Sequence, residues 1–117
     1  MQWNAVASIV HTGNKNKGLW EDKDALMALL GCGKTNVKLA CIMLIVTELS
    51  EAVENIRHRE MPDDKIPEFT GLEAELADAV IRIMDLGERF QLRIGKAIVS
   101  KIKYNETRYW RHGGKLA

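Results

Sequence analysis

Two pairs of acidic residues share the same spacing on segments that the sequence predicts to be neighbouring helices. The segments ELSE at 48–51 and ELAD at 75–78 each place two carboxylates three residues apart. Residues i and i+3 share one face of an α-helix. Apolar residues border both pairs, so neither pair is typical of a remote solvent face. If the two helices are antiparallel neighbours, four carboxylates can converge: Glu48, Glu51, Glu75 and Asp78.

Converged carboxylates repel one another, and this repulsion indicates a cation. Two like charges about 5 Å apart cost roughly 3 kcal/mol at an effective dielectric near 20. All-oxygen ligation is what hard ions such as Mg²⁺ or Mn²⁺ prefer. The pattern therefore predicts a divalent metal site held by the four acids.

Other interpretations of the acids remain open. A lone E-x-x-E pair is usually a solvated helix face, although two such pairs beside apolar stripes favour a site. A di-iron bundle normally shows E-x-x-H on two helices, and no His lies three residues after any of these acids. Glu54 and Asp85 extend the acidic rows, and we expect them to support the cluster or to form surface salt bridges.

Helical periodicity and capping residues predict the elements that carry these acids. Thr70 and Glu73 form a capping-box pattern, and Thr35 or Asn36 is a suitable N-cap for the helix before it. The Gly- and Asn-rich stretch 12–18 predicts a loop. No segment alternates as a half-buried strand does. The expected helices span about 3–12, 21–30, 37–59, 71–91 and 93–110.

The fold class predicted from this pattern is all-α, an antiparallel bundle of about four helices built on two long ones. The run LACIMLIV at 39–46 is apolar all round, so its helix should be central or lie at a subunit interface. We therefore expect oligomerisation through the bundle, as a homodimer or a dimer of dimers. Cys41 lies in this run and is expected to belong to the core.

Length and composition bound the remaining possibilities. A chain of 117 residues with 46% hydrophobic and 28% charged residues is typical of one globular domain, 1–117. A net charge of +1 gives no support to a nucleic-acid polymer as partner. Two cysteines suggest neither a disulfide scaffold nor a zinc site. With no predicted signal peptide or membrane span, we expect a cytoplasmic location and no membrane partner.

Charge is distributed unevenly along the chain. Residues 92–117 hold seven Lys or Arg and one acid, whereas residues 1–91 carry a balance of −5. An acidic body with a basic end could bind a cation and a polyanion side by side. A solvated basic tail is the alternative.

Three segments together resemble the MazG-like and dCTP-pyrophosphatase group of all-α nucleoside triphosphate (NTP) pyrophosphohydrolases. The acidic pairs, the segment ELADAVIRIMDLGER at 75–89 and the ending KIKYNETRYWRHGGK at 101–115 carry the resemblance, which covers 37–115. It implies cleavage between the α and β phosphates of a ribo- or deoxyribonucleoside triphosphate, which releases the monophosphate and pyrophosphate.

The resemblance also implies roles for individual residues. The four acids would bind Mg²⁺, with Mn²⁺ as a substitute, and Glu51 would orient or deprotonate the attacking water. Asn105 would face the nucleotide, and His11 and Trp20 would border the base pocket. The candidates to contact the triphosphate are Lys101, Arg108, Arg111 and Lys115.

Several of these roles have plainer alternatives. Trp20 could pack against the bundle, His11 could be an exposed helix-end residue, and 112–115 could be a disordered end. The stretch 21–36 resembles an insertion, which leaves base specificity open. The segment GCGKT at 31–35 is not a P-loop, because Ala28 stands where that motif needs Gly. A non-enzymatic helical module that binds nucleotide or protein is the alternative function.

Overall fold

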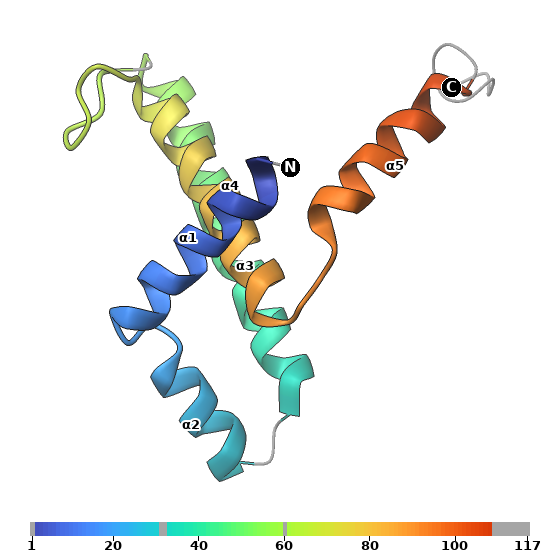
Figure 1. Cartoon of the computed structure of the whole chain (residues 1–117). Helices are drawn as coiled ribbons and strands as arrows, with labels where there is room; N and C mark the ends of the chain where they lie inside the picture. The colour runs from blue at the N-terminus through green and yellow to red at the C-terminus, as the bar shows by residue number, and fades with distance from the viewer. Residues whose placement is uncertain (1, 31–32, 60, 109–117) are drawn as a thin grey trace.

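The chain is all-helical in the computed structural model, which describes residues 2–30, 33–59 and 61–108 (Figure 1). Within these ranges no strand forms, and an isolated antiparallel bridge joins Pro62 to Thr70. No helix in the described part is long and apolar enough to cross a membrane. The helices are α1 (Gln2–Asn16), α2 (Glu21–Leu30), α3 (Gly33–Arg57), α4 (Gly71–Arg89) and α5 (Ile94–Glu106).

Helices α3 and α4 lie side by side and antiparallel, as the sequence predicts, and they form the centre of the fold (Figure 1). Helix α1 crosses α4, and α2 leads away from the centre and contacts α3, which runs back toward it. Helix α5 diverges from the other four after a tight turn. The acidic pairs therefore lie on the two helices with the most extensive mutual packing.

The start of α4 is fixed by the predicted capping box. Glu73 donates its backbone N–H to Oγ1 of Thr70 at 3.1 Å, and its own carboxylate accepts the Thr70 N–H at 3.2 Å. Gly71, the residue after Thr70, packs tightly against α3, since a Cβ at this position would lie 1.9 Å from Oδ1 of Asn55. Local capping and this close approach together set where α4 begins beside α3.

Three predicted helix boundaries are wrong. Helix α5 ends at Glu106 rather than near residue 110, since Thr107 is its C-cap residue, and the other two boundaries lie in α1 and α3. Helix α1 does not end near residue 12 but continues to Asn16, and the turn falls at 17–20, where Gly18 has φ +79°. Asn14 binds α4 through its side chain, and this tertiary contact outweighs its low helix propensity. Helix α3 begins at Gly33, whose φ of +65° favours glycine, so Thr35 and Asn36 lie inside the helix rather than at its cap.

The buried core is small and lies where α3 and α4 meet the α1–α2 turn. Ile83 and Phe90 pack against it. Cys41 is buried in this core, as expected, and burial raises the pKa of its thiol. Trp20 packs in the same cluster and is 2% exposed. The core residues are Trp20, Val37, Cys41, Ile45, Ala79 and Leu86.

The chain is extended and leaves much apolar surface uncovered. Its radius of gyration is 17.3 Å, whereas a compact monomer of this length has about 13 Å. Leu76 and Val80 of α4 are 45% and 40% exposed, and Ile102 of α5 is 53% exposed, because no described segment covers them. Large apolar residues also remain exposed along α3: Leu39, Ile42, Met43, Val46, Leu49, Val53 and Ile56.

A Schellman-type turn ends α4 and sends α5 away. The backbone N–H of Leu92 donates to the carbonyl of Gly87 at 2.8 Å, and that of Gln91 donates to the carbonyl of Glu88 at 3.3 Å. Gln91 occupies the left-handed position with φ +56°. Glycine is the usual residue at this position, so the turn holds a non-glycine residue in a strained conformation.

Candidate metal centre and adjoining pocket

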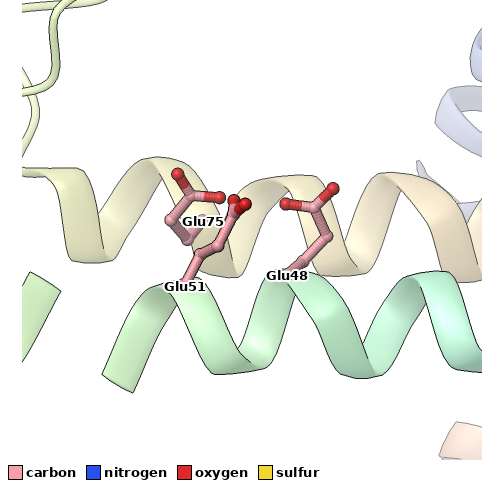
Figure 2. A group of neighbouring side chains, drawn as sticks. All are labelled: Glu48, Glu51 and Glu75. Atoms are coloured by element: carbon pink, nitrogen blue, oxygen red, sulfur yellow. The ribbon is translucent and has the colours of Figure 1, made fainter. Parts of the chain in front are cut away.

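Three of the four predicted ligands come together. One carboxylate oxygen from each of Glu48, Glu51 and Glu75 lies within 4.8 Å of the other two. Figure 2 shows the three side chains on the same side of the α3–α4 pair, with Glu75 reaching from α4 toward the two acids of α3. The i, i+3 spacing on α3 and the antiparallel packing of α4 produce this convergence.

Asp78 lies one turn further along α4 and lines the same cavity, but it does not belong to the close group of three. The cavity has a volume of about 400 Å³. Its walls therefore combine all four predicted acids with two cations and a few other side chains. The remaining lining residues are Asn14, Leu19, Lys65, Ile81 and Arg82.

Glu75 carries the clearest sign of an unsatisfied site. Its Oε2 is buried and has no hydrogen-bond partner among the described residues. Burial, followed by the neighbouring carboxyls of Glu48 and Glu51, raises the pKa of Glu75 to about 7. A buried oxygen acceptor without a donor, next to two further carboxylates, fits a hard divalent cation.

Glu48 is held by an ion pair instead. Nε of Arg82 donates to Oε1 of Glu48 at 2.7 Å, and the Glu48 side chain is only 10% exposed. Burial acts to raise the pKa of Glu48, but the hydrogen bond and charge of Arg82, together with the adjoining Glu75 and Glu51 carboxyls, outweigh it, so the pKa is lowered. Burial and the charge of Glu48 raise the pKa of Asp78.

Asp85 organises the region next to this cluster. It is 8% exposed, and its Oδ1 lies 2.7 Å from both Nε1 of Trp20 and Nδ1 of His11. Its Oδ2 accepts a hydrogen bond from Nδ2 of Asn14 at 2.9 Å. Of the two roles expected for Asp85, the surface salt bridge is therefore wrong, because the carboxylate is buried and ties α1 and the α1–α2 turn to α4.

A second cavity of about 270 Å³ adjoins the first. Trp20, Cys41 and Leu44 contribute apolar wall, and Asp85 closes one side. Three residues, Asn14, Leu19 and Arg82, line both cavities, so the apolar pocket opens beside the carboxylates. An apolar pocket next to a few polar groups is the usual form of a small-molecule site.

The predicted substrate-binding residues fall into three groups. His11 and Trp20 lie near the apolar pocket, and both are hydrogen-bonded to Asp85. Their rings meet edge to face, with the ring centroids 5.8 Å apart. Lys101, Asn105 and Arg108 are exposed on or just after α5 and do not line either cavity of the single chain. Arg111 and Lys115 lie outside the described residues.

Sequence reasoning missed the cations that do line the acidic cavity. Lys65 reaches it from the α3–α4 loop, where Oδ2 of Asp63 accepts the backbone N–H groups of Lys65 and Ile66 at 2.9 Å. Arg82 reaches it from α4. Its position four residues after Asp78, on the same helix face, was a signal that could have placed it. Glu54, by contrast, pairs on the surface with Arg57 and His58.

Comparison of the chain with family models, with curated proteins and with solved structures finds no match.

Proposed function

We propose that the chain is a magnesium-dependent pyrophosphohydrolase of nucleoside triphosphates, similar to the MazG-like group. The observation that carries the proposal is the convergence of Glu48, Glu51 and Glu75, with an unpartnered buried oxygen on Glu75. An apolar cavity beside this acidic one supports a substrate with both an aromatic base and charged phosphates.

In this proposal Glu48, Glu51 and Glu75 hold the ion, and Asp78 stands ready as a further ligand. A bound divalent ion would lower the pKa of water and neutralise charge that develops on the phosphates. Glu51 is the most exposed of the three, which suits it to orient the attacking water. The pocket bordered by Trp20 and Leu44 would take the nucleoside.

We further propose that the protein works as a homodimer or a dimer of dimers. The chain exposes 9107 Å², whereas a compact monomer of its mass, 13.2 kDa, exposes about 6400 Å². The apolar row on α3 and the diverging α5 account for much surface that a second copy could cover. Assembly could also bring the cations Lys101 and Arg108 to a carboxylate cluster, which a single chain does not do.

The test is pyrophosphate release from a panel of ribo- and deoxyribonucleoside triphosphates with Mg²⁺. We expect turnover of at least one nucleotide and its loss with EDTA. Glu51→Gln should lower kcat by roughly 10²–10⁴-fold, while Glu54→Gln, on the same helix but paired with Arg57, should retain activity. No turnover of any nucleotide at high protein and metal concentration would contradict the proposal.

The exposed apolar face of α3 also favours a second candidate, a helical module that binds nucleotide or protein without catalysis. If the protein is such a module, the Glu51→Gln variant should bind the ligand as tightly as the wild type does. An enzyme would instead remain folded with the same substitution and lose turnover.

A further inference from the structure

Arg82 stands at the junction of the two cavities. It lines both the apolar pocket and the acidic cavity, and its side chain is 42% exposed. The other cation at the apolar pocket, Lys23, lies over the Trp20 ring at 4.4 Å. Arg82 is therefore the basic residue placed between the space suited to a nucleoside and the space suited to an ion.

The bond that Arg82 makes conflicts with metal binding. Its Nε donates to Oε1 of Glu48, and Glu48 is one of the three acids whose oxygens converge. A cation bound to the cluster would need the Glu48 carboxylate, which the Arg82 guanidinium already holds. The cation and the guanidinium would also repel each other, since two like charges at this short range repel even where solvent partly screens them. Both cannot keep their closest positions.

Arg82 also has donors to spare. A guanidinium carries five N–H donors in a planar fork, and Glu48 takes the one at Nε. Such a fork matches the oxygens of a phosphate group. Released from Glu48 and partly exposed, Arg82 could turn toward an anion in either adjoining cavity without leaving α4.

We propose that Arg82 is an exchangeable counter-cation, which neutralises Glu48 in the metal-free chain, yields it to a divalent ion, and then binds a phosphate oxygen of the substrate. The inference rests on the proposed function. In the metal-free protein, Arg82 would weaken metal binding. In the metal-loaded protein, the same residue would strengthen phosphate binding. Metal and phosphate binding would thereby favour each other.

The first experiment measures Mn²⁺ affinity from the electron paramagnetic resonance signal of the free ion, with wild type, Arg82→Gln, Arg82→Lys and Arg57→Gln. Arg57→Gln removes the same charge from an exposed pair with Glu54 and serves as the control. We expect Arg82→Gln to bind Mn²⁺ about three- to tenfold more tightly, since loss of the competing pair is worth roughly one factor of ten at most. Arg82→Lys should lie between Arg82→Gln and wild type.

The second experiment measures binding of inorganic tripolyphosphate by calorimetry, with Mg²⁺ in excess. Arg82→Gln should weaken this binding about tenfold or more, because a charge-assisted fork to phosphate is lost. Arg57→Gln should leave it unchanged. Circular dichroism of each variant establishes retained helix content, and Arg82→Lys carries both comparisons if Arg82→Gln loses it.

The outcomes separate this inference from the proposed function. Wild-type protein that binds no Mn²⁺ overturns both. In another outcome, the wild-type protein binds Mn²⁺ and cleaves a nucleotide, while the folded Arg82 variants bind Mn²⁺ no more tightly than Arg57→Gln. This result overturns the counter-cation role of Arg82 and supports the pyrophosphohydrolase. Tighter Mn²⁺ binding with undiminished tripolyphosphate binding overturns the phosphate contact.

Discussion

The indole Nε1 of Trp20 donates a hydrogen bond to Oδ1 of Asp85 at 2.7 Å, in the buried space between the α1–α2 turn and α4. Both residues are almost fully buried, with exposed fractions of 2% and 8%. Since His11 and Asn14 bind the same carboxylate, one side chain of α4 fixes three side chains of the N-terminal part. The apolar pocket is shaped by this arrangement.

Replacing Asp85 with Asn should therefore destabilise the fold. An amide has one acceptor oxygen, so it cannot satisfy all the donors that the carboxylate serves, and its NH₂ group would face other donors. We expect a loss of about 2–3 kcal/mol in the free energy of unfolding, measured by urea denaturation with Trp fluorescence. Asp64→Asn, in the exposed loop, is the matched control; equal stability of both variants would contradict the prediction.

The start of α4 could be predicted from the sequence, whereas the burial of Asp85 further along the same helix could not. The capping box at Thr70 and the convergence of the acids follow from local rules, namely side-chain capping and helical spacing. The end of α1 and the burial of Asp85 depend on contacts between residues more than 70 positions apart. A single sequence does not reveal those contacts. The position of α5 could not be predicted for another reason. No described segment of the chain packs over its apolar residues, so their pattern does not indicate where the helix lies.

Stability of the metal-free protein should fall as pH rises through the range set by Glu75. The pKa of Glu75 is raised in the fold to about 7 from an ordinary 4.5. Between these values the folded state holds more protons than the unfolded state, so each rise in pH favours unfolding, and the effect ends above about pH 7. Glu75→Gln removes this dependence.

Urea unfolding in EDTA from pH 5 to pH 8 measures the effect. The free energy of unfolding of Glu75→Gln minus that of wild type should grow between pH 5 and pH 7 and then level off. Other titrating groups largely cancel in this difference. A difference that stays flat across the range would show that Glu75 titrates normally.

Magnesium should protect the wild-type fold against heat. An ion present at ten times its dissociation constant adds about 1.4 kcal/mol to the free energy of unfolding, which corresponds to a rise in Tm of roughly 5 °C. Glu51→Gln should lose most of this rise, whereas Glu54→Gln should keep it, because Glu54 lies outside the close group. An equal rise in Tm for both variants would indicate that the ion binds elsewhere.

A charge in the apolar row of α3 should dissociate the proposed oligomer. Met43 is 61% exposed in the single chain, and Met43→Glu would place an unpaired carboxylate within the interface. We expect light scattering after size-exclusion chromatography to show a shift toward monomer at micromolar concentration. Asn36→Glu, which adds the same charge in the polar first turn of α3, should leave the mass unchanged. A monomeric wild-type protein would refute the oligomer itself.

Gln91→Gly should stabilise the turn between α4 and α5. Gln91 has φ +56°, a conformation that costs an ordinary residue roughly 1–2 kcal/mol and glycine almost nothing. Glycine loses more backbone entropy on folding, so the net gain should be about 0.5–1 kcal/mol in the free energy of unfolding. Chemical denaturation of wild type, Gln91→Gly and Gln91→Ala measures it, since alanine truncates the side chain without relieving the backbone. Stabilisation by alanine equal to that by glycine would mean that the Gln91 side chain, rather than its φ, is the source of the strain.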